Sequence, residues 1–131
     1  MTVDDMKLEL KEDESPVTIA DKEAEQAMRD VIENYFPEHT IYGEEFGAHL
    51  PGRESGTDDA KLVWVLDPID GTKSFITGKP LFGTLVSLVY DGEPILGIID
   101  QPILGERYVS SLLLGSDDAL TDFLFLLLLV V

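Results

Sequence analysis

The spacing of apolar residues predicts one long amphipathic helix. Between Thr18 and Tyr35 apolar side chains recur every three or four residues, and Pro37 follows the last of them. They fall on one face of a helix, because one turn takes up about 3.6 residues. Either Thr18 or Asp21 can cap the first turn. The apolar set is Ala20, Ala24, Ala27, Met28, Val31, Ile32 and Tyr35.

Shorter apolar runs predict strands. Asp91-Gly92 separates two of these runs and is a strong hairpin signal. The predicted strands are Thr40–Tyr42, Leu62–Leu66, Phe82–Tyr90, Pro94–Gln101 and Tyr108–Ser110. We expect an antiparallel sheet with an apolar face that the helix covers, which makes the fold class α+β, or layered α/β. Residues 48–60 predict a loop and residues 75–80 a turn.

The two ends of the chain differ in composition from its centre. Residues 1–14 are acidic, with scattered apolar positions, and predict a short helix or a frayed arm. Residues 15–111 predict one domain, and residues 112–131 form an apolar tail. The longest apolar block, Phe123–Val131, is about half of what a membrane-spanning helix requires, so we expect no membrane span.

Composition and charge narrow the function. The chain of 131 residues has 26 acids, 9 bases and no cysteine, which gives a formal net charge of −17 and excludes thiol chemistry. So acidic a chain is a poor partner for nucleic acid. Most of its acids are expected on a solvated surface, although a bound cation would stabilise a few. His39 and His49 lack metal-ligand spacing and are predicted to lie on the surface. We expect no signal or transit peptide.

The stretch Trp64–Phe75, WVLDPIDGTKSF, contains a candidate metal site. Asp67 and Asp70 follow a predicted strand, and Pro68 between them stiffens the turn. The carbonyl of Ile69 is then free to face the same point. Magnesium prefers such hard oxygen ligands and often completes its shell with water and a substrate phosphate. The alternative is a plain turn, because Asp, Pro and Gly are common turn residues.

The next residues are candidates for binding an anion. Gly71 lets the backbone approach a ligand, and a helical turn that starts near Thr72 presents free N–H groups. Lys73 can add positive charge, or can simply be an exposed lysine.

Gly43–Glu45 (GEE), followed by WVLDPIDGTKSF, resembles the inositol monophosphatase family of metal-dependent phosphatases. Within that family, Thr72–Arg107 most resembles the plant-type histidinol-phosphate phosphatases. The resemblance extends over roughly Ser15–Ser110 and implies the first half of the family's fold. It also implies hydrolysis of a phosphate monoester with Mg²⁺ as cofactor. The implied substrate is histidinol phosphate, as in histidine biosynthesis, and inositol monophosphate is the alternative.

The resemblance gives roles to individual residues. Asp21 and Thr72 match the pair that activates the attacking water, although from the sequence alone Asp21 is better explained as a helix cap. Glu45 is less certain than its neighbour, and Lys11, Asp13 and Arg53 are better explained as surface charges. The implied metal ligands are Glu44, Asp67, the carbonyl of Ile69, and Asp70. The implied substrate-binding residues are Glu44, Ile69, Asp70, Gly71, Thr72 and Lys73.

The chain also departs from the family. Family members are longer, and their second half carries a further aspartate ligand and much of the substrate pocket. We therefore expect weak or no turnover. The alternative is a non-catalytic chain that binds a full-length relative. The expected partner is a small phosphorylated metabolite, and a homodimer is allowed. The resemblance suggests the chloroplast, and the cytoplasm is expected otherwise because no transit peptide is predicted.

Overall fold

A computed structural model describes residues 9–10, 16–50 and 62–112. The predictions for Lys11, Asp13, Arg53, most of residues 1–14, and residues 113–131 lie outside these ranges.

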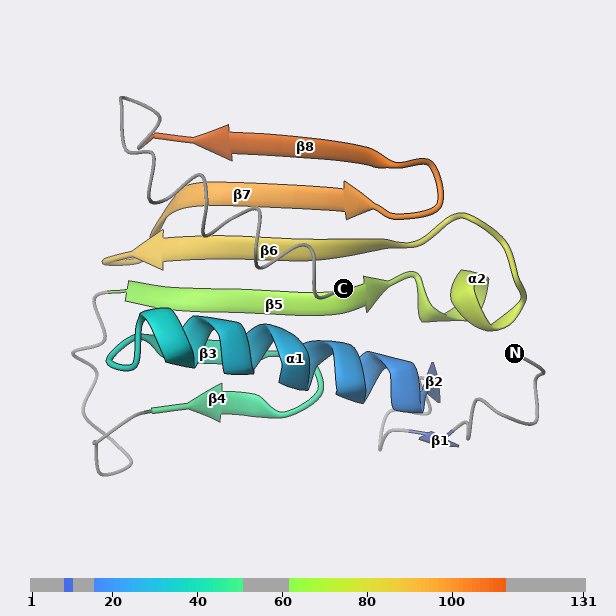
Figure 1. Ribbon diagram of the computed structural model, residues 1–131, viewed down its shortest axis with the longest axis horizontal. Helices are drawn as coiled ribbons and strands as arrows, with labels where there is room; N and C mark the ends of the chain where they lie inside the picture. Colours follow the sequence, from blue (N-terminus) through green and yellow to red (C-terminus); the bar gives the residue numbers. More distant parts are fainter. Residues whose placement is uncertain (1–8, 11–15, 51–61, 113–131) are drawn as a thin grey trace.

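A six-stranded sheet with the order β4-β3-β5-β6-β7-β8 forms the centre of the fold (Figure 1). The expected fold class is confirmed. The sheet is mixed, however, because β3 and β5 run parallel whereas the other neighbours are antiparallel. The strands are β3 (Thr40–Gly43), β4 (Gly47–His49), β5 (Leu62–Asp70), β6 (Gly83–Tyr90), β7 (Glu93–Gln101) and β8 (Glu106–Ser111). A separate pair joins β1 (Glu9–Leu10) to β2 (Pro16–Val17).

The helix α1 (Ile19–Tyr35) covers one face of this sheet (Figure 1). Thr18 is its N-cap, and Asp21 completes a capping box, so both predicted caps are used. The buried face matches the predicted one in part, since Met28 and Ile32 are buried whereas Tyr35 is 50% exposed. Charged side chains of α1 take buried positions where the pattern predicted alanines, which is possible because they find polar partners inside the fold. The buried residues of α1 are Asp21, Glu25, Met28, Arg29 and Ile32.

The hydrophobic core lies between α1 and the sheet. Alternate residues of the central strands point into it, as expected from the two-residue period of a strand. On β5, for example, Trp64 and Leu66 are buried, whereas Val65 between them is 39% exposed. The core cluster is Met28, Ile32, Ile41, Trp64, Leu66, Val86, Leu88, Leu96 and Ile98. Val65 thus lies on the sheet face opposite α1.

His39, predicted on the surface, is only partly exposed. Its Nδ1 accepts a hydrogen bond of 3.1 Å from Nε1 of Trp64, and its ring stacks on Phe36 at 4.8 Å between centroids. Burial lowers the pKa of His39. A neutral imidazole can both accept a hydrogen bond and stack on aromatic rings, which explains why His39 packs against Phe36 and Trp64. His49 is exposed, as predicted.

Several element boundaries differ from the predictions. β5 continues to Asp70 with an irregularity after Asp67, so the two aspartates belong to the strand itself. Ala48 and His49, expected in a loop, belong to β4. The hairpin at Asp91-Gly92 is confirmed, with positive φ angles of 49° and 84° that match a type I′ turn. The expected helical turn after Gly71 is the helix α2 (Thr72–Ile76).

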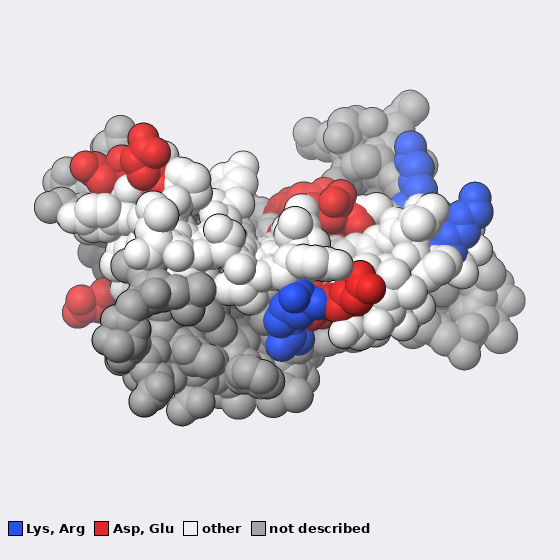
Figure 2. All heavy atoms as spheres, turned by 90° about the horizontal axis from the view of Figure 1, so that it is seen from above, with Lys and Arg blue, Asp and Glu red and all other residues white. Residues whose placement is uncertain are grey.

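The described charged side chains do not gather into one basic surface. On the face seen in Figure 2, acidic and basic groups are scattered among uncharged atoms, and one basic group adjoins an acidic one. Among the described residues, none of the helices is both long and apolar enough to cross a membrane.

Candidate metal and phosphate site

Parallel pairing brings Glu44 beside Asp67. Gly43 is the register partner of Leu66, and the N–H of Glu44 donates to the carbonyl of Leu66 at 3.0 Å. The backbone bond continues the β3–β5 ladder by one step beyond the strand. Glu44, the residue after β3, therefore lies at the same level of the sheet as Asp67, the last residue of β5 before its irregularity. The order of strands, and not closeness in sequence, joins the two carboxylates.

The Asp67 carboxyl group is strained electrostatically. Burial, a hydrogen bond and negative charge from Glu44, and the charge of Asp70 raise the pKa of Asp67 to about 7, against a small opposing effect of the Ile69 N–H. Within the described part of the chain, its Oδ1 is buried without a hydrogen-bond partner. Unpaired buried polar atoms are rare and call for an explanation such as a missing ion. A cation between Glu44 and Asp67 would relieve both effects.

The chemistry of these donors suits a hard cation, but the ligand set is incomplete. Among the described residues, no group of three His, Cys, Asp or Glu side chains gathers closely enough to hold a metal ion. Asp70 is exposed and acts on Asp67 through its charge. The carbonyl of Ile69 lies 3.2 Å from the hydroxyl of Thr72, which can donate its one proton either here or to Asp21, and it keeps a second lone pair. A hydrated Mg²⁺ needs only one or two carboxylates, so the pair fits such an ion.

The structure brings Asp21 and Thr72 together across 51 positions of sequence. The hydroxyl of Thr72 lies 3.4 Å from Oδ1 of Asp21. Asp21 is 1% exposed, and its Oδ2 accepts from both the N–H and the hydroxyl of Thr18. One carboxylate therefore caps the helix with one oxygen and reaches Thr72 with the other. Asp21 is thus the predicted helix cap, and its catalytic pairing with Thr72 stays a prediction.

The turn after β5 places Gly71 and Lys73 next to this pair. Gly71 has φ of 96°, and a Cβ there would lie 2.7 Å from the carbonyl of Leu81, so only glycine fits without strain. Its carbonyl accepts the N–H of Ser74 and of Phe75, which starts α2. Lys73 is exposed on α2.

Sequence reasoning missed Glu25 and Arg29. The Glu25 carboxylate is 0% exposed, pairs with Arg29 at 2.8 Å, and accepts the N–H of Glu45 at 2.6 Å. The available signal was spacing, since Glu25 lies one turn after Asp21 and one turn before Arg29. Charged residues on the inner face of a helix point to a polar contact inside the fold.

Comparison with known proteins supports the resemblance. A profile of the inositol monophosphatase family matches residues 2–117. This chain belongs to that family. Among curated family proteins, it is 61% identical over 99 residues to "Bifunctional phosphatase IMPL2, chloroplastic" of Arabidopsis thaliana, covering 76% of this chain and 27% of that protein. It is 44% identical over 98 residues to a histidinol-phosphatase of Chlorobaculum parvum, covering 75% of this chain and 35% of that protein.

Solved structures of inositol monophosphatase family proteins share the fold. The chain superimposes on the extragenic suppressor protein suhB of Bartonella henselae with a TM-score of 0.75 and 26% identity, covering 86% of this chain and 42% of that one. The two curated relatives are named as phosphatases, and the family is metal-dependent. This chain spans between about a quarter and two fifths of the length of these relatives, 27% to 42%.

Proposed function

We propose that this chain supplies the metal- and phosphate-binding part of the active site of a Mg²⁺-dependent phosphate monoester hydrolase that acts on histidinol phosphate. The observation that carries the proposal is the meeting of Glu44 with Asp67, whose buried Oδ1 has no hydrogen-bond partner in the described part of the chain. Family membership supports the reaction class, and the identity of 44% to a histidinol-phosphatase supports the substrate. Inositol monophosphate is the alternative substrate.

The carboxylates of Glu44 and Asp67 would hold the ion, and the carbonyl of Ile69 and the carboxylate of Asp70 are the further ligands that the family resemblance implies. When bound, Mg²⁺ supplies positive charge to a phosphate oxygen and lowers the pKa of coordinated water. The residues' own contribution is to present negative oxygens at one strand end, among them Oδ1 of Asp67, which has no hydrogen-bond partner among the described residues. The carbonyl of Pro68, at the back of the turn, accepts from the hydroxyl of Thr84 at 2.8 Å, which holds the turn on β6.

Asp21 and Thr72 would orient the attacking water. The hydroxyl of Thr72 can donate to Asp21 at 3.4 Å, which leaves its lone pairs free to accept a hydrogen bond from that water. Catalytic hydrogen bonds are often long in the absence of substrate, so this distance fits the role. The amides near Gly71 and Thr72, with Lys73 beside them, would bind the phosphate.

Metal titration and phosphate release test the proposal together. Calorimetry of the full chain with Mg²⁺ should show binding that Asp67→Asn weakens, because Asn cannot supply a negative oxygen. Phosphate release from histidinol phosphate should be weak, should depend on Mg²⁺, and should exceed release from inositol monophosphate. Equal Mg²⁺ affinities of wild type and Asp67→Asn would contradict the metal assignment. Robust turnover would contradict the expectation of weak activity.

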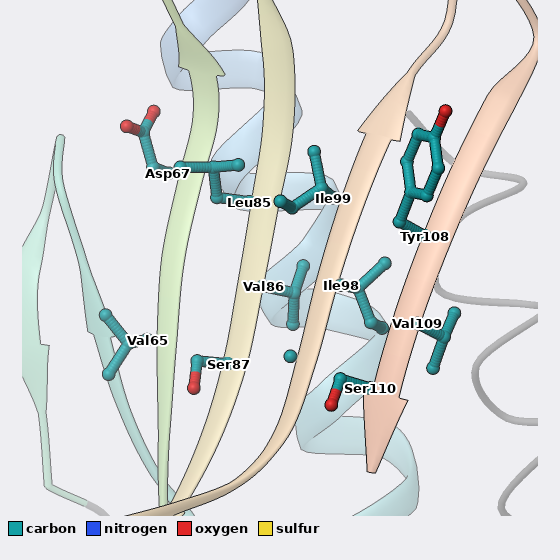
Figure 3. A pocket seen from close by; sticks show the side chains of 11 residues that line it. Val65, Asp67, Leu85, Val86, Ser87, Ile98, Ile99, Tyr108, Val109 and Ser110 are labelled. Atoms are coloured by element: carbon teal, nitrogen blue, oxygen red, sulfur yellow. The ribbon is translucent and has the colours of Figure 1, made fainter.

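A specific observation also favours the second candidate, a non-catalytic chain that associates through its sheet. The sheet face opposite α1 has a hollow of about 540 Å³ with a largely apolar lining, to which β5, β6, β7 and β8 contribute (Figure 3). Ile99 and Tyr108 in this lining are 53% and 61% exposed. Burying such surface against a homologous chain is favourable. Sedimentation of wild type and Ile99→Lys tests this: a dimer that the variant dissociates supports it, and a wild-type monomer contradicts it.

A further inference from the structure

Glu25 lies where it can control the turn that carries Glu44. Gly43 pairs with Gly47 across the β3–β4 hairpin, so residues 44–46 form the loop between the strands. The Glu25 carboxylate enters this loop from α1 and accepts the N–H of Glu45 at 2.6 Å and of Phe46 at 3.2 Å. A charged acceptor makes such bonds stronger than bonds between neutral groups.

Arg29 holds the carboxylate in this place. Its Nε donates to Oε1 of Glu25 at 2.8 Å, and its Nη2 donates to the carbonyl of Gly47 at 2.6 Å. The guanidinium carbon also lies 5.9 Å from the centre of the Phe46 ring. Arg29 is 5% exposed, so the pair is closed off from water. The carboxylate thus binds the loop amides, and the guanidinium binds the carbonyl of Gly47, the first residue of β4.

Close packing leaves the carboxylate little room to move. A Cβ added to Gly43 would overlap the Glu25 carboxylate. On the other side of Glu44, its own N–H is bound to the carbonyl of Leu66 at 3.0 Å. The backbone is therefore held both at Glu44 and at the residue after it. The fixed backbone therefore sets the direction of the Glu44 side chain.

We propose that Glu25, held by Arg29, is a positioning residue that fixes the loop so that the Glu44 carboxylate meets Asp67 at the metal site. This inference rests on the proposed metal function, to which it adds a role for two residues that touch neither metal nor substrate. Groups that orient a ligand from behind typically change metal affinity 10- to 100-fold when they are replaced.

The main test compares Mg²⁺ affinity, by calorimetry on the full chain, in wild type and Glu25→Gln. We expect the affinity to fall by about 10- to 100-fold, since the amide cannot accept both N–H groups while it faces Arg29. The matched control is Glu33→Gln, which removes the same charge from the same helix at a side chain 43% exposed. Its Mg²⁺ affinity should equal that of wild type. Equal affinities of wild type and Glu25→Gln would overturn the inference and leave the proposed function intact.

Two further measurements cover a variant that does not fold. Gly43→Ala acts from the other side, because its methyl group would push the carboxylate off the loop amides while Arg29 stays; the same fall in affinity is expected. In the wild type without metal, the N–H groups of Glu45 and Phe46 should exchange slowly with solvent hydrogen, although they lie in a loop. Rapid exchange at both would overturn the inference.

Failure of the proposed function gives a different result. A wild type that binds no Mg²⁺ rejects the metal site, whatever the loop does. Amide exchange then decides the positioning role by itself. Slow exchange at Glu45 and Phe46 that Glu25→Gln or Gly43→Ala makes fast supports the hold on the loop, and exchange that neither variant changes refutes it.

Discussion

Glu25 and Asp67 are both carboxylates set against the sheet, but their oxygens end in different surroundings. Glu25 is fully buried, with both oxygens bonded to backbone amides and one of them also to Arg29. Asp67 is half-buried, faces Glu44 and Asp70, and has an oxygen without a partner within the described residues. A buried charge is tolerated when its hydrogen bonds are complete, whereas a crowded carboxylate with an unpaired oxygen destabilises the fold. The surroundings of Glu25 therefore suit a structural role, and those of Asp67 suit the binding of a cation.

The largest expected effect comes from breaking the satisfied group. Glu25→Gln should lower the free energy of unfolding by about 3–5 kcal/mol, because it leaves Arg29 as a buried charge without a counter-ion. Urea unfolding of the full chain measures the loss. Glu33→Gln, the surface control, should stay within about 0.5 kcal/mol of wild type. A loss below about 1 kcal/mol for Glu25→Gln would mean that the pair is not closed off from water.

Adding Mg²⁺, the proposed partner of Asp67, should stabilise the folded chain. Mg²⁺ at 100 times its dissociation constant should raise the free energy of unfolding of wild type by about 2.7 kcal/mol, because it binds the folded chain alone. Asp67→Asn should gain less at the same Mg²⁺ concentration. Thermal unfolding with and without Mg²⁺ checks both. Equal gains in the two proteins would place the ion elsewhere.

Without metal, Asp67 should make stability depend on pH in an unusual direction. Its pKa is raised from 3.8 to about 7 on folding, so between these values the folded chain binds more protons than the unfolded chain. Stability from this group is therefore complete below pH 3.8 and is lost as the pH rises to about 7. Solvent screening of the half-exposed group limits the loss to about 1–2 kcal/mol.

Asp67→Asn provides the control for this titration, since it cannot ionise. The difference in free energy of unfolding between wild type and Asp67→Asn should move against wild type from pH 4 to pH 7 and stay constant above. Urea unfolding in a chelating buffer measures it. A difference that does not vary with pH would show that Asp67 ionises normally.

The smallest expected effect concerns Thr72. Its hydroxyl lies 3.2 Å from the carbonyl of Ile69 and 3.4 Å from Asp21, both long distances for such bonds. Thr72→Val should therefore change the free energy of unfolding by less than about 1 kcal/mol. Phosphate release should fall far more, by about 10²-fold or more, if the hydroxyl orients the attacking water. Parallel losses in stability and turnover would make Thr72 structural.

Much of the fold follows from local sequence. The apolar run of residues 62–66, the Asp91-Gly92 turn and the helical spacing from Thr18 to Tyr35 each predict an element that the structure contains. Local patterns work here because a strand or helix needs its own period to present one face to a core. The role of Gly71 and the helical turn after it were also predictable from local sequence, because glycine readily adopts a positive φ, and Gly71 has φ of 96°.

The sequence by itself determined which chemistry is present: two aspartates beside Pro68, a glutamate after Gly43, and a threonine after Gly71. Only the tertiary structure decided which of these groups meet. The parallel pairing of β3 with β5 joins Glu44 to Asp67, and α1 carries Asp21 to Thr72 and Glu25 to the loop. These contacts join residues 20 or more positions apart, so they depend on strand order and helix packing, which no local period encodes.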